Sequence, residues 1–170
     1  RRGDGTPFVV LEFCEGPTLS DVLAAESALP YPRVIELGRQ VCAGLAVAHA
    51  AGLAHGDLKP NNIVLTQREG REEVKLLDFG ALPKGPPGAP PAGVPEYWSP
   101  EQATGQGPGP LSDIYSLGIV LYEALAGRPP FRSHTLSDLI VQHTQVPPTP
   151  PKAPKGLPPI RQALVQIVLR

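Results

Sequence analysis

The sequence predicts a single α+β domain that is mainly helical and contains one β-hairpin. A length of 170 residues suits one hydrophobic core of moderate size. Apolar side chains recur at helical spacing, most clearly over residues 32–52. Two short apolar runs, residues 63–65 and 74–77, are joined by a polar stretch around Gly70, which is typical of a β-hairpin.

Composition limits the class of protein and its compartment. A net charge of −1 gives no argument for nucleic acid or an anionic membrane as a partner. Cys14 and Cys42 lack metal-ligand spacing, so we interpret them as reduced thiols of a cytosolic protein. No apolar run reaches the ~20 residues of a membrane span, and no signal peptide opens the chain. We therefore expect a cytoplasmic chain, with any membrane anchor of the parent protein outside it. Because Met is absent even at position 1, we expect a piece of a longer reading frame.

The first third of the chain contains a predicted strand and two predicted helices. Residues 7–14 are β-branched, aromatic and apolar, which indicates a buried strand, with an isolated strand expected at 8–13. Thr18 then caps a short helix, with Asp21 at its third position. From residue 32 to 52 one helix is expected, with Pro32 in its first turn and Gly52 after its end.

The second half contains three predicted helices separated by prolines. Residues 111–126 form a mostly apolar helix that ends before Gly127. Thr135 and Asp138 predict a capping box that opens a helix to Thr144. Residues 160–170 again show helical spacing.

Three histidines outside the motifs receive structural interpretations. We expect His49, near the end of the helix at 32–52, to be a satisfied packing residue rather than a catalyst. We expect His134 and His143 to be solvated.

Residues 55–80 contain the groups that carry chemistry. Asp57, Lys59 and Asn62 lie at offsets of two and three residues, and Asp78 follows the second strand of the hairpin. Because the hairpin returns the chain to its starting edge, Asp57 and Asp78 are expected to converge on one point. A base, a cation and metal-ligand side chains in one cleft suit phosphoryl transfer.

This stretch, HGDLKPNN followed by DFG, resembles the catalytic and metal-binding loops of protein kinases. Ser99-Pro100-Glu101 matches the A-P-E that closes the kinase activation segment. Lys59 and the YSLG and SPEQ wording are most similar to bacterial, Hanks-type serine/threonine kinases. The resemblance implies a protein kinase-like fold without its N-terminal lobe: residues 1–16 as the last N-lobe strand and hinge, and 17–170 as a truncated C-lobe.

The resemblance also implies catalytic roles. Asp57 would be the general base toward the acceptor hydroxyl, and Lys59 would contact the transferring phosphoryl group. Asn62 and Asp78 would hold Mg²⁺ that bridges the phosphates of ATP. The partner would be a protein substrate with a Ser or Thr acceptor. Asp113 would brace the backbone of the catalytic loop.

Four further residues complete the nucleotide-binding set implied by the resemblance. Leu11 would be the gatekeeper, and the backbone of Glu12 and Cys14 would hydrogen-bond the adenine. Val64, on the first hairpin strand, would contact the nucleotide as well.

The chain departs from the kinase pattern at three places. Gly56 stands where most members carry an Arg that pairs with a phosphorylated activation-loop residue. The loop from Ala81 to Trp98 has no Ser or Thr, and Tyr97 carries its only hydroxyl. Val94 replaces the usual Thr, whose hydroxyl bonds the catalytic Asp and Lys in the family. We therefore expect that phosphorylation of this loop does not switch activity on.

Other family parts do not occur in these residues. A Gly-rich loop, the strand lysine and its helix glutamate would lie before Arg1. The arginine that usually pairs with Glu101 would lie after Arg170. We expect the 170-residue chain alone to have no measurable kinase activity.

Two alternatives to an active protein kinase stay open. A small-molecule phosphotransferase of the aminoglycoside or choline kinase type shares the His55-Gly56-Asp57 start but generally lacks the lysine found at 59 and the DFG with a following SPE. A non-catalytic pseudokinase scaffold is compatible with Val94 and the proline-rich loop.

Overall fold

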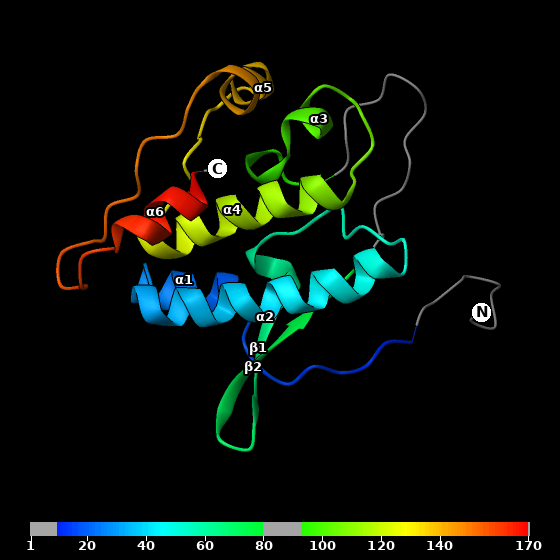
Figure 1. The fold of residues 1–170 in the computed structure, drawn as a ribbon, viewed down its shortest axis with the longest axis vertical. Coiled ribbons are helices and arrows are strands. Elements are labelled where there is room, and N and C mark those ends of the chain that lie inside the picture. The colour runs from blue at the N-terminus through cyan, green and yellow to red at the C-terminus, as the bar shows by residue number, and fades with distance from the viewer. Residues whose placement is uncertain (1–9, 80–92, 170) are drawn as a thin grey trace.

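A computed structural model describes residues 10–79 and 93–169 of the chain. In this part the protein is mainly helical with one two-stranded antiparallel sheet, as the sequence predicts (Figure 1). The helices are α1 (Leu19–Glu26), α2 (Tyr31–Ala50), α3 (Pro100–Ala103), α4 (Pro110–Ala126), α5 (Leu136–Gln145) and α6 (Gln162–Val168). The strands are β1 (Ile63–Arg68) and β2 (Arg71–Leu76), and short 3-10 turns occur at Pro60–Asn62 and Pro95–Tyr97.

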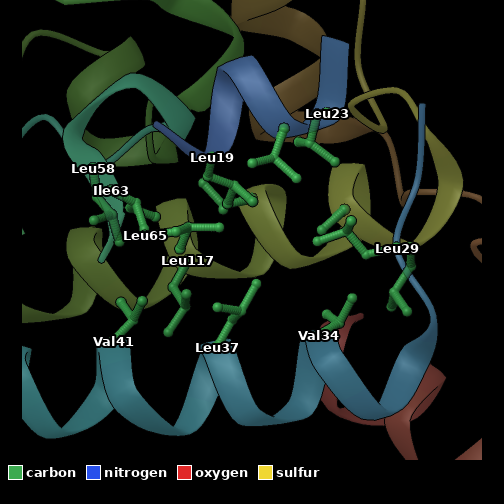
Figure 2. Close-up of a cluster of buried hydrophobic side chains, with 14 of the residues drawn as sticks. Leu19, Leu23, Leu29, Val34, Leu37, Val41, Leu58, Ile63, Leu65 and Leu117 are labelled. Carbon is green, nitrogen blue, oxygen red and sulfur yellow. The ribbon is translucent and has the colours of Figure 1, made fainter. Parts of the chain in front are cut away.

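Helices α2 and α4 form the centre of the fold and pack against each other (Figure 1). The hairpin contacts α1 and α2, and α6 contacts α4. The helix predicted at 32–52 is confirmed as one unbroken helix, and its apolar stripe is buried. Figure 2 shows this stripe, with Val34, Leu37 and Val41 pointing toward leucines of α1 and α4. Burial of this face stabilises the central pair of helices, because each buried Val or Leu contributes about 1.5–3 kcal/mol.

Helix α1 begins where the sequence places its cap. The Thr18 hydroxyl oxygen accepts a hydrogen bond from the Asp21 backbone N–H at 3.1 Å, and Asp21 Oδ2 accepts from the Thr18 backbone N–H at 2.9 Å. This reciprocal pair is the predicted capping box, and it satisfies two backbone donors that the helix itself leaves free.

The predicted hairpin is confirmed over residues 63–76. Its strands pair in register from Ile63 opposite Leu76 to Arg68 opposite Arg71. Beyond the last pair, the Leu77 backbone N–H donates to the Asn62 carbonyl at 2.9 Å. The hairpin therefore brings the residue before β1 beside the residues that follow β2.

The predicted strand at residues 7–14 is wrong for its described part. Residues 10–13 form no strand, and residues 7–9 lie outside the described residues. Among the described residues before α1, backbone pairing with the sheet is confined to Pro17 and Thr18, where Leu65 N–H donates to the Pro17 carbonyl at 2.9 Å. A strand requires a neighbour for its backbone groups, and none of the described residues pairs with residues 10–13, whose side chains at Val10 and Phe13 are exposed.

The later helices agree with the sequence except in two details. Helices α4, α5 and α6 occupy the predicted segments. At α5, the Thr135 hydroxyl accepts from the Asp138 N–H at 3.2 Å. The described contacts contain no bond from the Thr135 N–H to the Asp138 carboxylate, so only half of the predicted capping box forms.

The prediction that His143 is solvated is wrong, whereas His134 is exposed as expected. His143 is buried against the Phe131 ring, and its Nδ1 lies 2.8 Å from the Tyr115 hydroxyl. Its position on the inner face of the short helix α5 explains this burial. Across the part of the chain that the structure describes, no helix combines the length and apolar character needed to cross a bilayer.

Candidate active site

The structure brings Asp57, Lys59 and Asn62 together in the loop before β1. Lys59 Nζ donates to Asp57 Oδ2. Asn62 Nδ2 donates to the Asp57 carbonyl at 2.8 Å and to Oδ2 of the same residue at 3.3 Å. The loop thus presents a half-buried carboxylate whose one oxygen is held by a cation and an amide. This is the grouping that the sequence predicts.

Asp113, at the start of α4, holds the backbone of this loop. Its side chain is 1% exposed. Oδ1 accepts from the Gly56 N–H at 2.8 Å, and Oδ2 accepts from the His55 N–H at 2.8 Å. The predicted bracing role of Asp113 is therefore confirmed.

The interpretation of His49 as a satisfied packing residue is confirmed as well. His49 Nε2 lies 2.7 Å from Asp113 Oδ2, at the point where the end of α2 meets the start of α4. This contact adds a third donor to the buried carboxylate, which leaves the charge well compensated.

Gln102 holds the other side of the loop, and sequence reasoning missed it. Its Nε2 donates to the Gly56 carbonyl at 2.9 Å, while its Oε1 accepts from the Ser99 N–H at 3.1 Å. The spacing of Ser99 and Gln102 is itself a capping-box pattern, S-x-x-Q, and could have indicated that Gln102 has a fixed orientation.

Gly56 has a local structural reason to be glycine. Its φ is +80°, and a Cβ at this position would lie 3.0 Å from Cγ of Pro108. A side chain here must therefore tolerate the left-handed region and displace a proline ring.

Asp78 lies next to this group, but its side chain makes no contact with it among the described interactions. It is exposed and has a φ of +61°, two residues past the end of β2. The bond between Leu77 and Asn62 places it at the same edge of the sheet. The expected convergence of the Asp57 and Asp78 side chains stays a prediction.

The residue after Asp78 packs against the start of the catalytic loop. The ring of Phe79 lies 4.7 Å, centroid to centroid, from the ring of His55, which is fully buried. Burial lowers the pKa of His55, although the nearby carboxylate of Asp113 opposes this effect. His55 therefore acts as a neutral packing residue near pH 7.

The expected adenine-contacting residues lie apart from these groups. Leu11 is 69% exposed, and Glu12 Oε1 lies 3.5 Å from Lys75 Nζ on β2. An open groove of about 860 Å³ is lined by Glu12 and Cys14 together with α1 and the hairpin, but not by Asp57, Asn62 or Asp78. The expected hinge residues Glu12 and Cys14 therefore line this groove without Asp57, Asn62 or Asp78.

Val64 differs from the other three, because it is buried and fixed. It is paired with Lys75 in the hairpin and forms an isolated bridge with Thr18.

The side-chain oxygens of Asn62 and Asp78 suit a hard cation that takes its remaining ligands from elsewhere. Among residues 10–79 and 93–169, no three His, Cys, Asp or Glu side chains converge on a metal site. Because Asn62 uses its Nδ2 for Asp57, its side-chain oxygen is left to act as a ligand, as is the exposed carboxylate of Asp78. Two oxygen ligands of this kind suit Mg²⁺, which takes its remaining ligands from water and phosphate.

The segment before α3 is anchored to α4. The Tyr97 hydroxyl donates to Glu123 Oε2 at 2.7 Å, and the Ser116 hydroxyl donates to the Tyr97 carbonyl at 2.7 Å. Burial raises the pKa of Glu123, against the opposing effect of the Tyr97 hydrogen bond. Most of the loop from Ala81 to Trp98 lies outside the described residues, which resume at Gly93.

Comparison with known proteins gives consistent results. Residues 4–157 match the family model described as protein kinase domain. The chain is 37% identical to serine/threonine-protein kinase Pkn1 of Myxococcus xanthus, over 96% of this chain and 24% of that protein. It is 37% identical to PknA of Mycobacterium tuberculosis, over 99% of this chain and 39% of that protein. It is 36% identical to PksC of Streptomyces coelicolor, over 99% of this chain and 32% of that protein. The chain thus spans well under half the length of these curated relatives.

Proposed function

Because the chain belongs to the protein kinase domain family, we propose that it forms the catalytic lobe of a serine/threonine protein kinase. The enzyme would transfer the γ-phosphate of ATP to Ser or Thr hydroxyls of protein substrates. The observation that carries this proposal is the convergence of Lys59 and Asn62 on the Asp57 carboxylate, on a loop held by Asp113.

Asp57 is the proposed general base. One carboxylate oxygen is bound by Lys59 and Asn62, so the other oxygen can accept the proton of an acceptor hydroxyl. Lys59 supplies a positive charge at this point, which offsets negative charge on a transferring phosphoryl group. Because Asp113 and Gln102 hold the loop from two sides, the base is positioned before substrate arrives.

Asn62 and Asp78 are the proposed metal ligands. Protein kinases use ATP with a divalent cation, and we propose Mg²⁺ because both residues offer oxygen ligands. When bound, the cation would neutralise charge on the ATP phosphates. Because Asp78 is exposed, its carboxylate can turn toward such a cation.

The nucleotide base would lie against the segment that precedes α1. We propose that Leu11, Glu12 and Cys14 contact the adenine together with Val64. In support, Val64 is buried outside the main core cluster, on the strand that follows the catalytic loop.

This assignment places the lobe boundary near residue 16. The main core cluster begins at Leu19, which supports a C-lobe that begins near residue 17. We also propose a cytoplasmic location, where ATP is available. Cys14 and Cys42 are both free thiols, in agreement with a reducing compartment.

The proposal is tested by incubating the full-length protein with γ-labelled ATP, Mg²⁺ and a protein substrate, followed by phosphoamino-acid analysis. Label on phosphoserine or phosphothreonine supports the proposal. Label transferred only to an aminoglycoside or choline would favour the small-molecule phosphotransferase. Titration calorimetry adds a second test: Asp78→Asn should weaken binding of Mg²⁺-ATP, whereas Asp57→Asn should not.

A further inference from the structure

Trp98 has a buried polar atom without a partner, next to the catalytic loop. Its side chain is 4% exposed, and no hydrogen-bond acceptor meets the indole Nε1 within the part of the chain that the structure describes. A buried N–H that lacks an acceptor costs about 1–3 kcal/mol. Such a group therefore calls for a structural or functional explanation.

Asp57 has a carboxylate oxygen, Oδ1, that accepts no hydrogen bond among the described contacts. Its Oδ2 accepts from Lys59 and Asn62. Oδ1 has no such partner within the described residues, although the Asp57 side chain is only 13% exposed to solvent. Within the described residues, an indole donor without an acceptor and a carboxylate oxygen without a donor thus occur in the same region.

Asp57 Oδ1 and Trp98 Nε1 both lie close to Gly93. A Cβ built on Gly93 would lie 2.8 Å from Asp57 Oδ1 and 3.2 Å from Trp98 Nε1. The two atoms therefore flank Gly93 and lie no more than about 6 Å apart, a separation that one bridging water can span. With a φ of +111° and no room for a side chain, this position requires glycine. Val94, the next residue, has no polar side-chain atom that could serve either group.

We propose that Trp98 is a positioning residue for the catalytic base, with its indole N–H serving Oδ1 of Asp57 across a gap that one water molecule spans. With Oδ2 held by Lys59 and Asn62, a donor on Oδ1 fixes the rotation of the carboxylate. A fixed carboxylate keeps one lone pair directed at the acceptor hydroxyl, which raises turnover without tighter substrate binding. This role rests on the proposed function, because it requires Asp57 to accept a proton.

The test uses the full-length kinase with two replacements of Trp98. Trp98→Phe removes the N–H and part of the ring. Replacement of Trp98 by benzothienylalanine keeps the bicyclic shape and exchanges N–H for sulfur, so it decides the outcome if the Phe variant unfolds. We expect kcat to fall about tenfold for either replacement, the effect of losing one charge-assisted hydrogen bond. KM for ATP should change less than about twofold, because the contact acts on the base rather than on nucleotide binding.

A double-mutant cycle separates positioning from a general structural role. In an Asp57→Asn background, we expect Trp98→Phe to reduce the residual kcat by less than about twofold, because the carboxylate it serves is gone. Tyr115→Phe is the matched control: it removes an aromatic hydroxyl that bonds His143 rather than Asp57. Its kcat should stay near that of the wild type.

The outcomes distinguish the two levels of the argument. An unchanged kcat in the benzothienylalanine enzyme, or an equal loss in both Asp57 backgrounds, would overturn the role of Trp98 alone. If Asp57→Asn itself retained wild-type turnover, the proposed function would be refuted, and the role of Trp98 with it. A tenfold loss confined to the Asp57 background supports the positioning role.

Discussion

Asp113 accepts the backbone N–H of Gly56 at 2.8 Å through Oδ1, from the first turn of a helix that lies 57 residues further along the chain. Together with the bonds from His55 and His49, this contact ties the catalytic loop to the α2–α4 pair. The position of Asp57 is therefore determined by the most deeply packed part of the molecule, rather than by the loop alone.

Asp113→Asn should destabilise the domain. An amide presents one oxygen and one NH₂ group, so at least one of the donors from His55, Gly56 and His49 loses its acceptor and meets a donor instead. We expect the free energy of unfolding to fall by about 2–4 kcal/mol. Urea denaturation measures this change. The exposed Asp138→Asn, at the start of α5, is the control and should cost less than about 0.5 kcal/mol; equal costs would contradict the bracing role.

Stability should decrease as pH falls below 6.5. Burial lowers the pKa of both His143 and His55 from the ordinary value of 6.5, so the unfolded chain takes up protons in this range before the folded one does. Linkage then makes the free energy of unfolding rise with pH between the lowered values and 6.5.

The His143→Asn variant isolates the contribution of one histidine. Its side-chain oxygen can accept from the Tyr115 hydroxyl in place of Nδ1. Denaturation curves between pH 5 and 7 should show a smaller slope than in the wild type, because one of the two buried histidines no longer titrates. An identical slope would show that His143 is accessible to protons in the folded state.

Tyr97→Phe should lower the stability of the domain, because it leaves the buried Glu123 carboxylate without its hydrogen bond. The variant removes the 2.7 Å hydrogen bond to Glu123, whose pKa is already raised by burial. At neutral pH we expect a loss of about 1–3 kcal/mol in stability. The loss should shrink as pH falls, because a protonated Glu123 tolerates burial better than a charged one. Thermal melts at pH 5 and pH 8 measure the difference, and a loss independent of pH would indicate a packing defect instead.

Phosphorylation of the segment before α3 should not activate the enzyme. Gly56 supplies no guanidinium to bind a phosphate, and the Tyr97 hydroxyl is half-buried and bonded to Glu123. A phosphate without a cationic partner orders nothing. Mass spectrometry of the full-length enzyme, with activity assayed before and after phosphatase treatment, tests this. Phosphate at Tyr97 with a large loss of activity on its removal would refute the prediction.

The sequence predicts those parts of the fold that depend on local patterns. The stripe from Val34 to Leu45, the cap at Thr18 and the apolar pairs of the hairpin each follow from spacing that the structure confirms. The failures concern partners distant in the chain. Residues 10–13 of the predicted strand find no neighbouring strand within the described part of the chain, and His143 is buried by Tyr115 and Phe131.

The site shows the same division. The family spacing indicated Asp57, Lys59 and Asn62, and the bracing by Asp113, because these are motif positions. The contact of Gln102 with the loop and the position of Trp98 beside Gly93 were not predicted, since they depend on how α3 and the residues before it fold back onto the loop. No local spacing encodes such tertiary contacts.

The most direct test of the central claim is the turnover of Asp57→Asn in the full-length enzyme, compared with the wild type at saturating Mg²⁺-ATP. Asn is nearly the same size as Asp but cannot accept the proton of the acceptor hydroxyl. The account predicts a loss of about 10²–10⁴ in kcat, the share of a positioned base, with Mg²⁺-ATP affinity preserved. Turnover equal to that of the wild type would contradict the account, because it would mean that Asp57 is not the base of a phosphoryl transfer.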